Sequence, residues 1–176
     1  MAKEIIKIGT EVTLSDTEQL LAKAIAKRRY QKSREAGVHN SRKGPQSDEA
    51  TDKEGMGGEI AFCKLFNVYP DLSIEVKSSA QGTDKGDCIL HVVGNGTVDV
   101  KTTIYPDGKL LAAPWKSKEG VDLYALMTGK FPTYTFKGFM TSADLMVEER
   151  YKTFSKSDAK AYVAHQRDLK EIKIEI

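Results

Sequence analysis

Apolar residues recur with helical spacing near the start of the chain. Residues 20–25, LLAKAI, supply an apolar stripe, Ser15 and Glu18 have the spacing of a capping box, and Gly37 is a typical helix stop. The pattern predicts a long first helix. Beyond Ile25 the stripe gives way to KRRYQKSREAG, so we expect only the first half of this helix to pack and the second half to project into solvent or onto a ligand.

The next two segments differ sharply in polarity. Residues 38–54 are polar and almost free of apolar side chains, which predicts a loop. Residues 55–68, GMGGEIAFCKLFNV, open with glycines and continue with mostly apolar side chains, which predicts a buried second helix. Because the segment lacks the Lys-Ser/Thr pair of a phosphate-binding loop, we expect its glycines to allow close packing and not to bind a nucleotide.

Short apolar runs with β-prone residues dominate the rest of the chain, so the pattern predicts strands after the helices, as in an α/β fold. Asn95-Gly96 between two such runs predicts a tight hairpin turn. Thr141 or Ser142 is expected to cap a short helix. The other predicted elements are strands at residues 4–8, 72–76, 88–93, 98–104, 121–129, 133–140 and 172–176, and a helix at about 157–169.

Composition narrows the class of protein. The chain has 176 residues, which suits one domain, and no apolar run approaches the length of a membrane helix, so we expect a cytoplasmic protein. Cys63 and Cys88 lie far apart without a CxxC spacing and read as buried hydrophobic residues. The three histidines have no zinc-ligand spacing, so any bound metal would need oxygen ligands.

The net charge of +2 hides an uneven distribution. A basic stretch follows the apolar part of the first helix, and such an excess attracts polyanions, although a charge run is also typical of a merely solvated face. The candidate nucleic-acid-binding residues are Lys27, Arg28, Arg29, Lys32, Arg34, Arg42 and Lys43, with Lys116 and Lys118 in a later loop.

Three acids and one lysine are candidates for chemistry. In TVDVKTTI, the alternation of a strand puts Asp99 and Lys101 on one face, which is also the pattern of an ordinary half-solvated strand. Asp87 begins the preceding strand, where a turn acid is equally common. Glu59 lies in the first turn of the predicted second helix, on the face of its apolar residues, so it is expected to need a cation.

This order of residues resembles the PD-(D/E)XK nuclease superfamily over roughly residues 55–146. The matching elements are the helix with Glu59, the pair Gly86-Asp87, in which glycine replaces proline, and the triplet Asp99-Val100-Lys101. The resemblance implies a restriction endonuclease-like core, a central mixed sheet flanked by helices, over residues 55–176 with a C-terminal helix. Residues 1–54 would form a basic helical arm and flexible loop.

The resemblance also implies a metal site. Asp87, Asp99, Glu59 and the backbone carbonyl of Val100 would bind Mg²⁺ or Mn²⁺, and Lys101 would position or activate water. Mg²⁺ takes oxygen ligands and keeps several waters, which agrees with these donors.

The predicted hairpin conflicts with this set in one respect. A two-residue turn at Asn95-Gly96 pairs Asp99 with His91 and leaves Asp87 about 13 Å farther along the strand. Either a bulge, a wider loop or strong twist brings Asp87 closer, or His91 or another acid replaces it.

We therefore expect a Mg²⁺-dependent deoxyribonuclease that acts on double-stranded DNA. The sequence does not distinguish endonucleolytic from exonucleolytic cutting, nor a monomer from a homodimer. A catalytically inactive nucleic-acid-binding or assembly protein of the same fold is the main alternative. A metal-dependent phosphohydrolase acting on nucleotides is less favoured, because an open basic arm does not suit a closed pocket for a small molecule.

Overall fold

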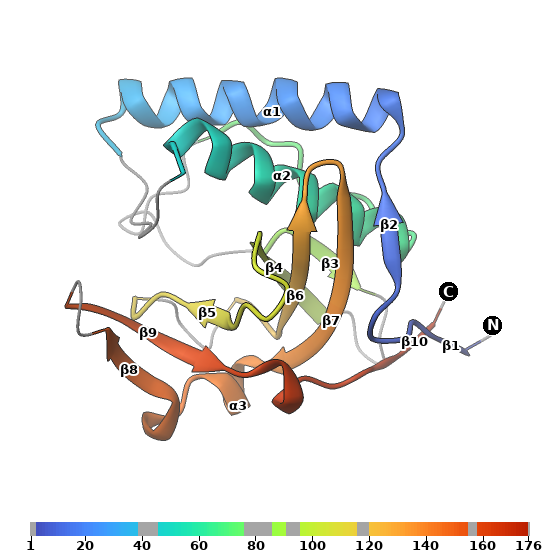
Figure 1. Ribbon diagram of the computed structural model, residues 1–176, viewed down its shortest axis with the longest axis vertical. Coiled ribbons are helices and arrows are strands. Elements are labelled where there is room, and N and C mark those ends of the chain that lie inside the picture. Colours follow the sequence, from blue (N-terminus) through green and yellow to red (C-terminus); the bar gives the residue numbers. More distant parts are fainter. Residues whose placement is uncertain are drawn as a thin grey trace.

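Two stacked helices cover one face of a curled sheet in the computed structural model (Figure 1). The structure describes residues 3–38, 46–75, 86–90, 96–115, 120–154 and 158–175. The helices are α1 (Asp16–Glu35), α2 (Asp48–Leu65) and the short α3 (Ser142–Leu145), with 3₁₀ turns at Glu148–Arg150 and Gln166–Asp168. No helix among these residues has the length and apolar character needed to cross a membrane.

Helix α1 begins as predicted. The Ser15 hydroxyl accepts a hydrogen bond from the backbone N–H of Glu18, and the Glu18 carboxylate accepts one from the backbone N–H of Ser15. This reciprocal pair satisfies two backbone donors at the helix start. The helix ends at Glu35, and Gly37 follows with a φ of 69°.

Helix α2 begins earlier than the sequence predicted. Ser47 caps it by accepting a hydrogen bond from the backbone N–H of Ala50 at 3.1 Å, so the expected loop through residue 54 is wrong from residue 48 onward. Asp48 and Glu49 lie in the first turn, where carboxylates interact favourably with the helix dipole. Residues 48–54 are polar and glycines follow them, so the sequence pattern gave no signal for a helix start at Asp48.

The glycines of α2 allow the helix to lie close against the sheet, as the sequence predicted. A Cβ atom added at Gly58 would lie 2.0 Å from the hydroxyl oxygen of Thr102, and one added at Gly57 would lie 2.2 Å from that of Tyr134. Both distances are far below van der Waals contact. A side chain at either position would push α2 away from the sheet.

The main sheet has five strands in the order β2-β7-β6-β4-β3. Strands β4 and β6 run parallel, and the other neighbours are antiparallel. The strands predicted at 121–129 and 133–140 are confirmed as β6 and β7, and Thr141 caps α3 as predicted. The bounds are β2 (Glu11–Thr13), β3 (Cys88–Leu90), β4 (Gly96–Thr103), β6 (Leu123–Lys130) and β7 (Thr133–Thr141). The mixed α/β class is thus confirmed.

The C-terminal region contains strands where a helix was predicted. Strand β9 (Ala159–Ala164) pairs with β5 (Leu110–Ala112) on one side and with β8 (Tyr151–Phe154) on the other. The alanines suggested a helix at 157–169, but pairing on both sides of β9 outweighs this preference. The chain ends with β10 (Lys173–Glu175), which pairs with β1 (Lys3–Ile5). No strand forms over residues 72–75.

Each face of the main sheet packs against its own core. Val98 and Val100 of β4 lie in the core under α2, with residues such as Phe62 and Cys63. Tyr124 and Leu126 of β6 lie in a second core on the other face, with Leu110 and Ala112 of β5 among others. Since strand residues alternate between faces, Asp99 and Lys101 lie on the face of Tyr124 and not under the helices.

Candidate functional site

The register of β3 and β4 brings Asp87 beside Asp99. Cys88 pairs with Val98 and Leu90 with Gly96, so the chain reaches Asp87 at the level of Asp99. The tight turn that would pair Asp99 with His91 is therefore wrong, because Gly96 already belongs to β4. The connection, residues 91–95 with His91, lies outside the described residues.

Asp87 forms hydrogen bonds with the two residues of β4 that flank Asp99. The N–H of Asp87 donates to the carbonyl oxygen of Val98 at 2.6 Å, and one carboxylate oxygen of Asp87 accepts from the N–H of Val100 at 2.7 Å. The N–H and C=O of one strand residue point toward the same neighbouring strand, so the Val100 carbonyl also points toward the Asp87 side.

Gly86 has a backbone conformation that requires glycine. Its φ is 72°, and a Cβ atom at this position would lie 2.7 Å from the carbonyl oxygen of Val98. Proline fixes φ near −65° and cannot adopt this conformation. The glycine lets the chain enter β3 close against β4, which places Asp87.

Asp99 and Lys101 form an ion pair. The Lys101 ammonium nitrogen lies 2.5 Å from a carboxylate oxygen of Asp99, whose side chain is 4% exposed, whereas that of Lys101 is 30% exposed. Burial alone lowers the pKa of Lys101, but the charges of Asp99 and Asp87 and the hydrogen bond with Asp99 outweigh it and raise this pKa. Lys101 is therefore a cation at neutral pH.

Tyr124 is a member of this cluster that the sequence did not reveal. It lies beside Asp99 in the parallel pairing of β4 and β6, and the Lys101 ammonium is 6.0 Å from the centre of its ring. Burial and the negative charges of Asp99 and Asp87 raise the pKa of Tyr124 to about 12, against the opposing effect of Lys101. Only the pairing of two strands far apart in the sequence identifies this residue.

Glu59 is held by a cation, as predicted, but in a separate contact. Its carboxylate lies 3.1 Å from Arg29 of α1. Arg29 also donates to the carbonyl oxygens of Asp71 and Ser73, and the N–H of Asp71 donates to the carbonyl oxygen of Asp87 at 2.9 Å. Arg29 thus connects Glu59 to the backbone that supports Asp87.

The oxygen atoms of this cluster could supply only a few of the ligands that a Mg²⁺ ion needs. Among the described residues, no group of three His, Cys, Asp or Glu side chains could together hold a metal ion. Asp87 and Asp99 offer two carboxylates beside the Val100 carbonyl, and Mg²⁺ commonly binds one or two carboxylates plus water and substrate phosphate. The residues therefore fit Mg²⁺ with Asp87 and Asp99, and Glu59 remains paired with Arg29.

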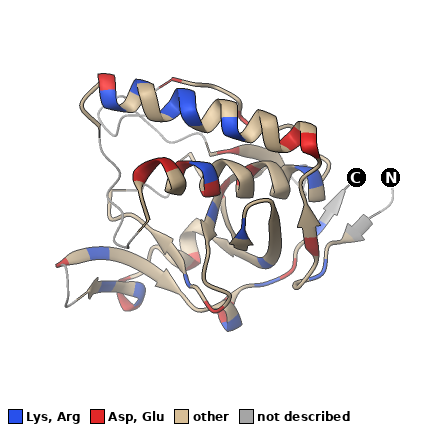
Figure 2. Cartoon of the chain, turned by 45° about the horizontal axis from the view of Figure 1, so that its top comes forward, with Lys and Arg blue, Asp and Glu red and all other residues tan. Residues whose placement is uncertain are grey.

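Basic positions recur along α1, and acidic positions lie on α2 beneath it (Figure 2). Most of the predicted basic residues on α1 have acidic partners. Arg29 pairs with Glu59, Lys32 with Glu75 and Arg34 with Asp48, so the second half of α1 packs and does not project as expected. Lys27 and Arg28 are exposed and could meet a polyanion. The remaining candidates, Arg42, Lys43, Lys116 and Lys118, lie outside the described residues.

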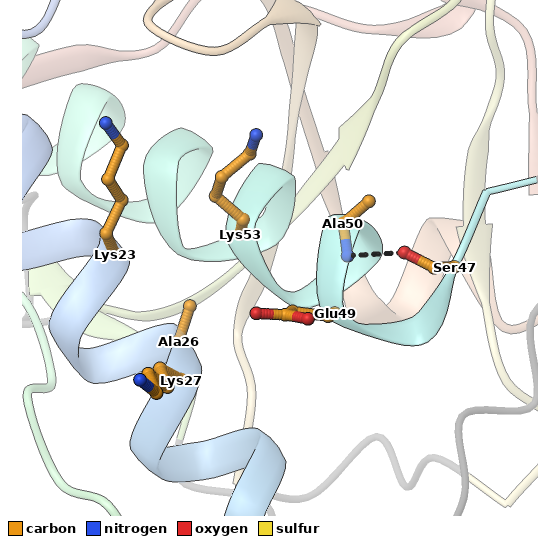
Figure 3. A pocket seen from close by; sticks show the side chains of 7 residues that line it. All are labelled: Lys23, Ala26, Lys27, Ser47, Glu49, Ala50 and Lys53. Atoms are coloured by element: carbon orange, nitrogen blue, oxygen red, sulfur yellow. Dashed lines mark hydrogen bonds between the residues drawn. The ribbon is translucent and has the colours of Figure 1, made fainter.

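A hollow of about 410 Å³ lies between α1 and the start of α2. Figure 3 shows the Glu49 carboxylate directed into the gap between the helices, while Lys23 and Lys53 extend away from it in a common direction. The ammonium groups of these lysines lie 5.3 and 5.4 Å from the centre of the Phe131 ring. Three lysines, Lys23, Lys27 and Lys53, line the hollow together with this one acid, so its lining has an excess of positive charge.

The two cysteines lie against each other next to Asp87, so we expect them to resist alkylation. Both are buried, and the neighbouring Cys88 thiol, burial and the charges of Glu59 and Asp87 raise the pKa of Cys63 well above its usual range. Because only the thiolate reacts, iodoacetamide at pH 8 should leave both thiols of the folded protein unmodified for hours and modify both in urea. Rapid labelling of the folded protein, read by mass spectrometry, would contradict this packing.

Comparisons with known proteins place the chain in one family. Residues 4–173 match the model of the Family of unknown function (DUF5843), so the chain belongs to that family. Neither the curated proteins nor the solved structures contain a match to the chain.

Proposed function

We propose that this DUF5843 protein is a metal-dependent nuclease that hydrolyses DNA phosphodiester bonds at the cluster of Asp87, Asp99 and Lys101. The observation that carries the proposal is the register of β3 and β4, which puts Asp87 beside Asp99. We further propose that α2 and the main sheet form a restriction endonuclease-like core. The support is the helix α2 followed by strands carrying these residues, with Asp87 directly before β3 and beside Asp99 of β4.

Each residue of the cluster has a distinct role in this proposal. Asp87 and Asp99 would hold Mg²⁺, with the Val100 carbonyl directed to the same side. A bound ion would lower the pKa of water and stabilise charge on the phosphate. Arg29 acts as a positioning residue, because it fixes the segment that hydrogen-bonds to the backbone of Asp87.

The charge state of Lys101 defines its part in the reaction. With its pKa raised, the side chain keeps its proton at neutral pH. A protonated lysine beside a phosphodiester stabilises the negative charge that develops on the phosphoryl oxygens. Its exposed fraction gives it access to a substrate outside the sheet.

The experiment that tests the proposal is a cleavage assay with the wild-type protein on supercoiled plasmid and end-labelled linear DNA at low salt. Mg²⁺ or Mn²⁺ should support cleavage and EDTA should abolish it. Nicked plasmid would identify an endonuclease, and loss of the end label without nicking would identify an exonuclease. Intact DNA under every metal condition would contradict the proposal.

A second candidate function is nucleic-acid binding without catalysis. The observation that favours it is the internal pairing of the charged residues, Lys101 with Asp99 and Arg29 with Glu59, because a purely structural cluster has the same contacts. DNA binding that is equal in wild type and Lys101→Ala, with no cleavage by either protein, would support this candidate.

Two basic residues of α1, Lys27 and Arg29, are expected to differ in their effects on DNA binding and on protein stability. Lys27→Ala removes an exposed charge, so we expect weaker DNA binding and a decrease of about 1 in the salt dependence of log K, with an unchanged melting temperature. Arg29→Ala removes the hydrogen bonds to Glu59 and to the carbonyl oxygens of Asp71 and Ser73, so we expect it to cost about 3 kcal/mol of stability. Fluorescence anisotropy at several salt concentrations and thermal denaturation measure the two effects. Equal effects of both substitutions on stability would contradict the assignment.

A further inference from the structure

Three lysines border the hollow between α1 and the start of α2. Lys23, Lys27 and Lys53 form no ion pair in the part of the chain that the structure describes. Three cations farther along α1 differ, because acids of α2 and of the segment after it neutralise them. Charges of one sign that are not neutralised repel one another, so an anion among the three ammonium groups would be stabilised.

The ring of Phe131 holds two of these lysines in place. The ammonium groups of Lys23 and Lys53 lie 5.3 and 5.4 Å from the centre of the ring, within the range of cation–π attraction. The ring is itself fixed, because the backbone N–H of Phe131 donates to the Glu54 carboxylate at 2.9 Å and a Cβ atom added at Gly57 would lie 2.9 Å from the ring. One ammonium group from each helix is therefore held at the same ring.

The charge of the lining indicates the charge of a ligand. The Glu49 carboxylate is directed into the gap between the helices (Figure 3), and within the described residues it pairs with none of the lysines. Three ammonium groups and one carboxylate leave the lining with a net charge of +2. A phosphate monoester carries about −1.5 to −2 at pH 7, whereas each phosphodiester of a DNA chain carries about −1. The lining therefore matches a monoester better than a diester.

The size of the hollow suits a small ligand. Its volume of about 410 Å³ lies within the range of about 300–1,000 Å³ that is typical of pockets for small molecules. A phosphate group and the sugar that carries it are smaller than this space. Lysine binds phosphate as a compact point charge, so it needs no fixed direction of approach.

We propose that this hollow binds a phosphate monoester, either that of a free nucleoside monophosphate or that at the 5′ end of a DNA strand. Lys23 and Lys53 contact the phosphate from the two helices, and Lys27 adds its charge from the next turn of α1. The hollow is separate from the cluster of Asp87 and Asp99, and the inference does not depend on the proposed nuclease function.

Calorimetric titration at low salt tests the site, with AMP, adenosine and an oligonucleotide with or without a 5′-phosphate as ligands. EDTA is present so that no DNA is cleaved. We expect AMP to bind and adenosine, which lacks the phosphate, not to bind. A 5′-phosphate that tightens oligonucleotide binding by about tenfold or more identifies a DNA end as a ligand of the site. Equal binding of the two oligonucleotides, with AMP still bound, identifies the free nucleotide.

The double variant Lys23→Ala with Lys53→Ala removes the site, and Lys160→Ala is the matched control. We expect the double variant to weaken AMP binding by about tenfold or more, and to lower the melting temperature by less than about 5 °C because only contacts with the Phe131 ring are lost. Lys160 is an exposed lysine of β9, on the other side of the main sheet, so Lys160→Ala should leave AMP binding unchanged. Glu49→Gln should tighten AMP binding by about threefold, since it removes negative charge from the lining.

Three results would overturn the inference. Equal binding of adenosine and AMP would show that the protein does not recognise the phosphate. A loss of AMP binding in Lys160→Ala as large as in the double variant would show that net charge, and not the hollow, attracts the ligand. A wild-type protein that binds neither AMP nor the phosphorylated oligonucleotide would remove the site, and cleavage of DNA by the same protein would leave the proposed function standing.

Discussion

Replacing Lys101 by alanine is expected to lower the rate of DNA cleavage by about 10³-fold or more, while DNA binding changes little. In the proposed mechanism, the partly exposed Lys101 ammonium faces the substrate. Electrostatic stabilisation of the reacting phosphate is commonly the largest single contribution to catalysis. Cleavage of labelled DNA under single-turnover conditions, beside binding measured by anisotropy, gives both quantities. A rate within about tenfold of wild type would contradict the role of Lys101.

The same substitution also affects stability, so it needs a control. Without Lys101 the buried carboxylate of Asp99 has lost its nearest cation, and breaking a buried pair in this way costs about 3–5 kcal/mol. The double variant Asp99→Asn with Lys101→Met removes both charges and should regain most of that stability. It should remain inactive. A double variant that is stable and active would show that the ion pair takes no part in the reaction.

Gly58→Ala is expected to destabilise the protein by about 2 kcal/mol, although alanine favours helices by about 1 kcal/mol over glycine. The added Cβ would lie 2.0 Å from the Thr102 hydroxyl oxygen and 2.9 Å from the Thr102 Cβ. Because Thr102 is a branched residue within β4, α2 must move away from the strand that carries Asp99 and Lys101. Urea denaturation measures the loss, and cleavage activity should fall with it.

Two further variants test this explanation. Gly55 lies in the same helix, and a Cβ atom added there would have nothing within 4 Å, so Gly55→Ala should stabilise the protein by about 0.5–1 kcal/mol. Adding Thr102→Ala to Gly58→Ala makes room for the methyl group and should restore most of the loss. Equal effects of Gly55→Ala and Gly58→Ala would show that the close contact between α2 and β4 is not what requires glycine.

Local sequence signals predicted the elements that depend on local interactions. Ser15 and Glu18 marked the start of α1 because a capping box acts within four residues, and short apolar, β-prone runs marked β4, β6 and β7. The resemblance to the PD-(D/E)XK superfamily implied that Asp87, Asp99 and Lys101 are neighbours, whereas the predicted hairpin register separated Asp87 from Asp99. Their participation in catalysis stays a prediction.

The errors arose where long-range pairing outweighs local preference. The Asn95-Gly96 signal favoured a tight turn, but the pairing of Leu90 with Gly96 sets a different register and brings Asp87 to Asp99. The segment near residue 160 was predicted as a helix, whereas it forms strand β9, which pairs with β5 and β8. Arg29 resembled a ligand-binding cation because its partner, Glu59, lies thirty positions away in the sequence.

The measurement that tests the central claim most directly is plasmid cleavage by wild type and Asp99→Asn, side by side in Mg²⁺ and in EDTA. Asparagine has nearly the same shape as aspartate but lacks the charge that would bind the metal ion. The account predicts cleavage by wild type in Mg²⁺ alone and none by Asp99→Asn under either condition. Equal cleavage by the two proteins, or cleavage by wild type in EDTA, would contradict it.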